Sequence, residues 1–199
     1  MAVIERFYGR IDRNNLCFNQ NEVAARLKTE RGYTNETILE CEKLLLDSVD
    51  CRYCAVRTDV LISDEKNIDL GFLKTESKAL AKNLSDCSEC YIMAVTLGNK
   101  VDILLKRLSV LSVAKSYIVD ALASALAESA ADLAEKIIKG DKECRPRFSP
   151  GYADLSLSIQ SGVLNILEAS KYLGVSVSKT NLMNPQKTIT AFIGIKTKE

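Results

Sequence analysis

The spacing of apolar positions changes along the 199-residue chain, and this change separates helices from strands. Several segments have the composition and periodicity of amphipathic helices. We expect helices over residues 21–32, 35–49, 75–84, 99–108, 113–138 and 158–173. Thr34 or Asn35 is expected to cap the second helix and Asn99 the fourth, because short polar side chains accept backbone hydrogen bonds there. Gly140 and Gly174 are expected to end the last two helices.

In other segments, apolar and polar residues alternate, or several apolar residues follow one another, over lengths that are typical of strands. They are residues 53–62, 68–72, 91–97, 175–180 and 188–195. Helices and strands mix without a regular βαβ order, which favours an α+β fold with a largely antiparallel twisted sheet flanked by helices. We expect one domain over residues 1–199, in which residues 1–85 add helices and strands that complete the sheet.

Composition narrows the possible functions. Lys plus Arg is 27 and Asp plus Glu is 26, so the charge of +1 gives no case for binding nucleic acid or an anionic membrane. No run reaches the roughly 20 apolar residues of a membrane span, and the first residues do not resemble a signal peptide. Seven cysteines without an export signal indicate a cytoplasmic protein with free thiols. The absence of histidine excludes Ser-His-Asp and Cys-His catalysis and every histidine-bound zinc site.

Two Cys-x-x-Cys pairs have the spacing of metal ligands, Cys51 with Cys54 and Cys87 with Cys90. Four thiolates could hold zinc or an iron–sulfur cluster, and a redox pair is a further alternative. In an extended strand, however, residues three apart point to opposite faces. We therefore favour buried structural thiols.

The sequence 147–152, Arg-Phe-Ser-Pro-Gly-Tyr, is the most distinctive segment of the chain. Pro150 and Gly151 allow a tight turn, Arg147 offers a planar fork for a carboxylate or phosphate, and Tyr152 offers an aromatic face. The segment is either a site for a small zwitterion or a structural turn. Glu128, in an alanine-rich helix, is likewise either a ligand contact or a solvated position.

This hexapeptide resembles the Arg-x-Ser/Ala-Pro-Gly-Tyr hallmark of the activation domain of cobalamin-dependent methionine synthase, in particular its small stand-alone branch. Similar segments occur in the same order: Thr96-Leu97-Gly98, the Ala/Leu-rich stretch 121–128, Asp154 with Gln160 after the hexapeptide, and Met183-Asn184-Pro185. The resemblance covers residues 90–195 and is faint before them. It implies the fold of that domain, with residues 86–199 as the part that binds S-adenosylmethionine.

The resemblance also implies a function. Such a domain reactivates a corrinoid methyltransferase, such as methionine synthase, by presenting the methyl group of S-adenosylmethionine to cob(II)alamin on a partner protein. One-electron reduction of the cob(II)alamin is trapped by the methyl transfer, which restores methylcobalamin. Arg147 would hold the methionine carboxylate, and backbone around Ser149 and Gly151 the nucleoside. Glu128 would bind the amino group or a nearby polar part of the ligand. Tyr152 would lie near the reacting end, as the catalytic candidate. The cobalamin would belong to the partner, and flavodoxin or ferredoxin would be a suitable electron donor; no metal ligand of the chain itself is implied.

Some positions depart from the family pattern. Lys179 stands where an acid is usual, and Ala153 and Ser156 replace a glycine and a proline. The acidic residue that the family uses near its N-terminus has no clear match. Two alternatives therefore stay open: a non-catalytic binding or scaffold module of a corrinoid system, and a cysteine-ligated metal protein.

Overall fold

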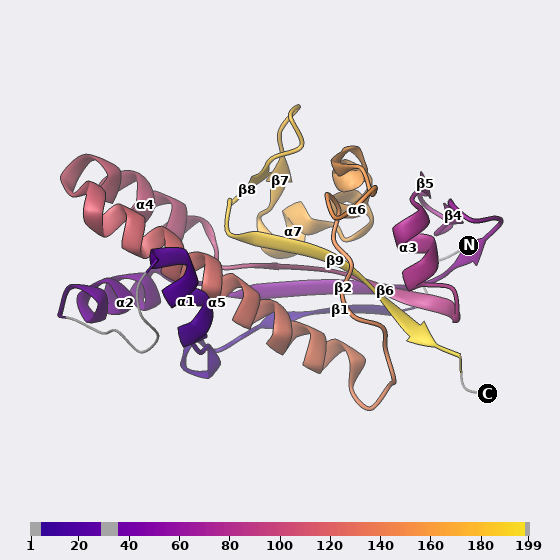
Figure 1. Cartoon of the computed structure of the whole chain (residues 1–199), viewed down its shortest axis with the longest axis horizontal. Helices are drawn as coiled ribbons and strands as arrows, with labels where there is room; N and C mark the ends of the chain where they lie inside the picture. The colour runs from indigo at the N-terminus through magenta and orange to yellow at the C-terminus, as the bar shows by residue number, and fades with distance from the viewer. Residues whose placement is uncertain (1–4, 29–35, 198–199) are drawn as a thin grey trace.

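A four-stranded antiparallel sheet forms the centre of the computed structural model, which describes residues 5–28 and 36–197 (Figure 1). Its strands lie in the order β1, β2, β6, β9, each antiparallel to its neighbour. Their bounds are Glu5–Arg10, Arg52–Asp59, Cys87–Thr96 and Thr188–Lys196. The first two strands come from the N-terminal part of the chain and the last two from the C-terminal part, so one sheet joins both. The α+β class with an antiparallel sheet is confirmed.

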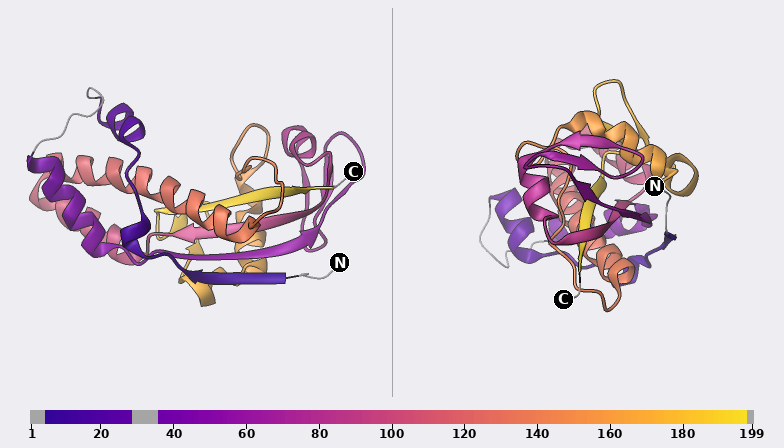
Figure 2. Two further views of the ribbon diagram at one scale, coloured as in Figure 1. Left: turned by 90° about the horizontal axis from the view of Figure 1, so that it is seen from below. Right: turned by 90° about the vertical axis from the view of Figure 1, so that its right-hand side faces the viewer.

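Helices cover both faces of this sheet (Figures 1 and 2). One face carries α1, α2, α4 and α5, which are Gln20–Leu27, Glu36–Ser48, Asn99–Leu111 and Val113–Lys139. The other face carries α3, α6 and α7, which are Lys78–Asn83, Gln160–Ile166 and Ala169–Leu173. The short strands β3, β4 and β5, Leu61–Ile62, Asn67–Asp69 and Lys74–Glu76, form a second sheet, and β7 with β8, Ser176–Val177 and Met183–Asn184, forms a hairpin. Single 3-10 turns, η1 and η2, cover Arg13–Asn15 and Leu157–Ile159.

Alternation along β6 divides the interior into two cores. Tyr91, Met93 and Val95 face the α5 side, whereas Ile92 and Ala94 face the α6 and α7 side. Successive side chains of a strand point to opposite faces, so one continuous apolar strand serves both cores. The alanines of α5 from Ala121 onward are buried, and their small side chains let the long helix lie close to its neighbours.

Helix α5 begins and ends where its sequence favours. The side chain of Ser112 accepts a hydrogen bond from the Lys115 amide at 3.4 Å, and Gly140 follows the last turn with φ +52°. The predicted helix over residues 113–138 and its glycine stop are therefore confirmed. None of the helices in the described part of the chain is both long and apolar enough to cross a membrane.

Other local predictions differ from the structure. The expected helix over residues 158–173 is interrupted, because Glu168 adopts a left-handed conformation with φ +48° between α6 and α7. The expected cap Asn99 is instead the first residue of α4, preceded by Gly98 with φ +88°. A Cβ atom at Gly98 would lie 3.0 Å from the backbone oxygen of Asp50, which explains the glycine. The predicted caps at residues 34 and 35 lie outside the described residues.

Candidate functional site

A surface groove lies between helix α5 and the segment 146–152, with a volume of about 350 Å³. Helix α5 supplies one wall, the proline-bounded loop supplies the other, and Ile189 of β9 contributes from the sheet. The lining residues are Glu128, Asp132, Glu135, Pro146, Arg147, Ser149, Tyr152 and Ile189. The fold thus brings together four of the five residues proposed from the sequence, Glu128, Arg147, Ser149 and Tyr152.

Arg147 is held by three carboxylates of α5. Its Nη1 atom donates to Asp132 Oδ1 at 2.7 Å and to Glu135 Oε2 at 3.1 Å, and its Nη2 atom donates to Glu128 Oε2 at 3.3 Å. The side chain is 19% exposed. Burial alone would lower the pKa of the guanidinium, but the hydrogen bond to Asp132 and the charges of the two glutamates outweigh it and raise the pKa. Arg147 therefore stays charged in a groove where carboxylates outnumber cations.

The pKa of Glu128 depends on burial and on several charges around the groove. Burial raises its pKa above the usual value of 4.5, and the positive charge of Arg147 opposes that rise. The negative charges of Glu22 and Asp132 raise the pKa further, whereas Arg26 lowers it. Glu128 therefore shares an electrostatic environment with helix α1 as well as with the loop.

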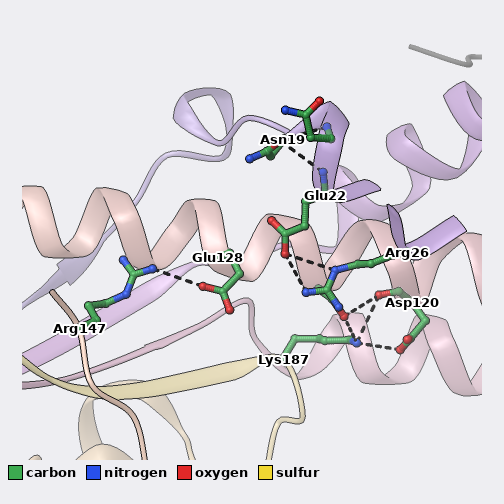
Figure 3. Close-up of polar contacts among 9 residues, drawn as sticks. Asn19, Glu22, Arg26, Asp120, Glu128, Arg147 and Lys187 are labelled. Atoms are coloured by element: carbon green, nitrogen blue, oxygen red, sulfur yellow. Dashed lines mark hydrogen bonds and ion pairs between the residues drawn. The ribbon is translucent and has the colours of Figure 1, made fainter. Parts of the chain in front are cut away.

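Helix α1 places a second ion pair, between Arg26 and Glu22, beside α5 (Figure 3). Arg26 donates to Glu22 Oε1 through Nη2 at 2.7 Å and through Nε at 3.3 Å. Asn19 begins this helix by accepting from the amides of Asn21 and Glu22. The sequence offered no clear match for the acidic residue that the family uses near its N-terminus. The structure places Glu22, in the first helix of the chain, near Glu128.

The hexapeptide forms a compact turn that is fixed to the sheet. Phe148 and Phe192 of β9 exchange two backbone hydrogen bonds, at 2.9 and 2.8 Å. The Tyr152 amide donates to Ser149 O at 3.0 Å, and the Tyr152 ring packs edge-on against Phe148 with 6.2 Å between centroids. Tyr152 nevertheless remains 55% exposed, so its ring is accessible beside the groove.

Gly151 serves the shape of the turn rather than the lining of the groove. Its φ is +91°, and its amide donates to Leu155 O at 2.8 Å. A Cβ atom there would lie 3.1 Å from Leu157 Cδ2. The resemblance gave the backbone around Ser149 and Gly151 to the nucleoside. Within that backbone, the Gly151 amide donates its hydrogen bond inside the loop.

Lys179 and Gln160, which the family pattern singled out, lie away from the groove lining. Lys179 is exposed between β7 and β8, in a hairpin on the opposite side of the sheet from α5 (Figure 1). Gln160 is 1% exposed, and its amide nitrogen lies 2.8 Å from Thr190 Oγ1 and 2.9 Å from Met183 Sδ. These contacts connect the start of α6 to β8 and to strand β9, so Gln160 has a structural role.

Asp120 of helix α5 belongs to a polar cluster that is separate from the groove. Lys187 Nζ donates to Asp120 Oδ1 at 2.7 Å and to Ser124 Oγ at 2.8 Å (Figure 3). The Lys187 side chain is 13% exposed. The pair therefore fastens the start of β9 to α5.

The two Cys-x-x-Cys pairs lie buried in the cores. Cys51 belongs to the α5-side core and Cys54 to the opposite one, as the alternation of a strand requires. Cys87 and Cys90 instead lie in the same core, because the register of β6 shifts between Cys87 and Glu89. Burial raises the pKa of both thiols to about 12. All cysteines are free, and no group of three or more metal-ligating side chains occurs within residues 5–28 and 36–197. This placement favours structural thiols, since a thiolate is the metal ligand and the nucleophile.

Asp132 and Glu135 are site residues that the sequence reasoning missed. Together with Glu128 they stand at i, i+4 and i+7 of α5, which places the three carboxylates on one helix face. That spacing is visible in the sequence. Of these three carboxylates, only Glu128 was singled out from the sequence.

Fold and site together define a mixed α+β domain with an acid-lined groove beside a proline–glycine loop. Among solved structures, the crystal structure of the MetH reactivation domain bound to AdoHcy superposes with a TM-score of 0.72. The match covers 99% of this chain and 81% of that chain, at 13% sequence identity. No protein-family model matches the chain, and no curated protein matches it in sequence.

The chain therefore has the fold of the MetH reactivation domain, and the resemblance drawn from the hexapeptide is confirmed at the level of fold. Because the sequence identity is only 13%, this likeness describes the backbone architecture. The ligand of the groove has to be argued from the groove itself.

Proposed function

We propose that this chain binds S-adenosylmethionine in the groove between α5 and the 146–152 loop, and that it presents the methyl group to a corrinoid carried by a partner methyltransferase. The observation that supports this most strongly is the groove itself, in which Arg147, Glu128 and Tyr152 meet in the fold of the MetH reactivation domain. That neighbour was crystallised with AdoHcy, the product left when S-adenosylmethionine loses its methyl group.

The charges of the groove suit this ligand. S-adenosylmethionine carries a sulfonium and an ammonium against one carboxylate, so it is a net cation. The groove places Glu128, Asp132 and Glu135 around Arg147, so its own balance is negative. Carboxylates attract the ammonium and the sulfonium, while the guanidinium fork of Arg147 accommodates the ligand carboxylate.

The loop wall adds an aromatic contact. Tyr152 is exposed beside the charged cluster, and the face of its ring attracts a cation such as a sulfonium. The sulfonium is itself an activated methyl donor. The chain therefore has to bind and orient the ligand, which explains how it could act without a histidine base.

Calorimetric titration with two ligands tests the proposal. The probes are S-adenosylmethionine and its decarboxylated form, which lacks the group assigned to Arg147. Wild type should bind both, with the intact ligand tighter. Arg147→Ala should weaken the intact ligand about tenfold or more, the scale of a charged hydrogen bond, without weakening the decarboxylated one.

Arg145→Ala is the matched control for this titration. Arg145 also forms a bidentate ion pair, with Asp86 at 2.8 and 2.6 Å, but it does not line the groove. This variant should bind both ligands like wild type. An Arg147→Ala variant with unchanged affinity for S-adenosylmethionine would remove Arg147 from the site.

A second candidate function is a binding or scaffold module of a corrinoid system that has lost the ligand. The observation that favours it is the pairing of Arg147 with three carboxylates of its own chain. A ligand carboxylate would have to compete with these carboxylates for the guanidinium nitrogens. Wild-type protein that binds neither ligand would support this candidate over the first.

A further inference from the structure

Asp154, two residues beyond the hexapeptide, joins the groove's loop to a distant part of the chain. Its Oδ1 atom accepts from Ser77 Oγ at 2.5 Å and from the Ala79 amide at 3.2 Å, and its Oδ2 atom accepts from the Lys78 amide at 2.7 Å. Ser77 and its neighbours begin helix α3. The pKa of Asp154 is lowered by these same hydrogen bonds, the one from Ser77 first.

Asp154 directly precedes Leu155, which takes part in a series of backbone hydrogen bonds that reaches the groove. The Gly151 amide donates to Leu155 O, the Leu155 amide donates to Tyr152 O at 2.9 Å, and the Tyr152 amide donates to Ser149 O. Leu155 is buried beside the loop, at 2% exposure. A displacement of Asp154 would therefore pass through Leu155 to Tyr152 and Ser149, which line the groove.

The loop also holds a residue in an unfavourable conformation. Ala153 has φ +48°, in the left-handed region that a residue with a Cβ atom disfavours. Such a conformation persists when the surrounding contacts determine it. The contacts around Ala153 are the hydrogen bond from the Leu155 amide to Tyr152 O and the attachment of Asp154 to α3.

We infer that Asp154 is a positioning residue of the groove. Phe148 attaches one end of the loop to β9, Asp154 attaches the other end to α3, and Ser149 and Tyr152 are presented between the two attachments. Asp154 lies outside the groove lining and acts through the loop. The ligand-binding part of this inference rests on the proposed function.

The test combines amide hydrogen exchange with calorimetric titration of S-adenosylmethionine. Asp154→Asn keeps the size of the side chain and removes its charge. We expect faster exchange at the Gly151 and Leu155 amides, unchanged exchange in the middle of α5, and affinity lowered about fivefold or more. A purely structural role would lower the melting temperature without this local pattern and without loss of affinity.

Asp64→Asn is the matched control. Asp64 also accepts two backbone amides, from Lys66 and Asn67 at 2.9 Å each, and its pKa is likewise lowered by hydrogen bonds, to about 2. It stabilises the turn between β3 and β4, so Asp64→Asn should leave the affinity and the loop exchange unchanged. If Asp154→Asn does not fold, Ser77→Ala removes one of the three donors and should show the same pattern more weakly.

The role of Asp154 and the binding of S-adenosylmethionine are tested by different results. Asp154→Asn with wild-type affinity and wild-type exchange at Gly151 would overturn the role of Asp154. A wild-type chain that does not bind S-adenosylmethionine would overturn the proposed function, and the exchange rates would still decide whether Asp154 fixes the loop.

Discussion

Removing Arg147 should destabilise the protein in a way that depends on pH. In the wild-type structure its guanidinium contacts Glu128, Asp132 and Glu135, all from one face of α5. In Arg147→Ala these three carboxylates would face one another without their common cation. The free energy of unfolding should therefore fall.

The burial of the partners sets the size of the effect. Removing one partner of a fully buried ion pair costs about 3–5 kcal/mol. The Asp132 side chain is 72% exposed and Glu128 38%, so water screens much of their repulsion, whereas Glu135 at 17% is screened less. After this discount we expect a loss of about 1–2 kcal/mol near neutral pH.

The pH dependence follows from Glu128. Burial raises its folded-state pKa above the unfolded value, and Arg147 opposes that rise. A carboxylate with a raised pKa destabilises the fold at high pH and ceases to do so as it takes up a proton. Without Arg147 the pKa rises further, so the loss of stability should be larger at about pH 8 than at about pH 5.

Urea unfolding of wild type, Arg147→Ala and Arg145→Ala at both pH values measures this difference. Arg145 holds the pKa of Asp86 below its usual value, and that contribution is lost only as the pH falls through the lowered pKa. The effect of Arg145→Ala should therefore be the same at both pH values. If Arg147→Ala lowers the free energy of unfolding equally at both pH values, or more at low pH, the electrostatic account of the groove is refuted.

Further predictions concern the fold around the groove. Gly98→Ala should lower the free energy of unfolding by about 2 kcal/mol, because a Cβ atom there is strained at φ +88° and lies close to Asp50; urea unfolding measures it, and wild-type stability would contradict the geometry. Gln160→Leu should cost about 1–3 kcal/mol by leaving the buried Thr190 hydroxyl without its partner, and a melting curve unchanged from wild type would argue against that contact. A thiol reagent should label exposed Cys17 first, as mass spectrometry of the native protein would show, and equally rapid labelling of the buried cysteines would contradict their placement.

The regular elements around the groove were predictable because local sequence determines them. The alanine-rich run after Ser112 predicts α5, and the apolar run over residues 91–97 predicts β6, which extends from Cys87 to Thr96. The hexapeptide predicts a tight turn from its proline and glycine. The face shared by Glu128, Asp132 and Glu135 was equally accessible, since helix spacing alone places them together.

What the sequence could not provide are contacts between distant segments. The attachment of Asp154 to the start of α3 spans 77 residues. The proximity of Glu22 to Glu128 depends on how α1 packs against α5. The family pattern places Lys179 at a position where an acid is usual, and the structure places it in the β7–β8 hairpin. Each depends on tertiary packing, which local periodicity does not encode.

The central claim is that the groove between α5 and the hexapeptide loop binds S-adenosylmethionine. Chemical-shift mapping of the wild-type protein during a titration with this ligand tests it most directly. We expect saturable shifts concentrated at the amides of residues 128–135 and 147–152. Shifts that do not saturate, or that gather around Asp102 and Gln186 in the separate groove beside α4, would contradict it.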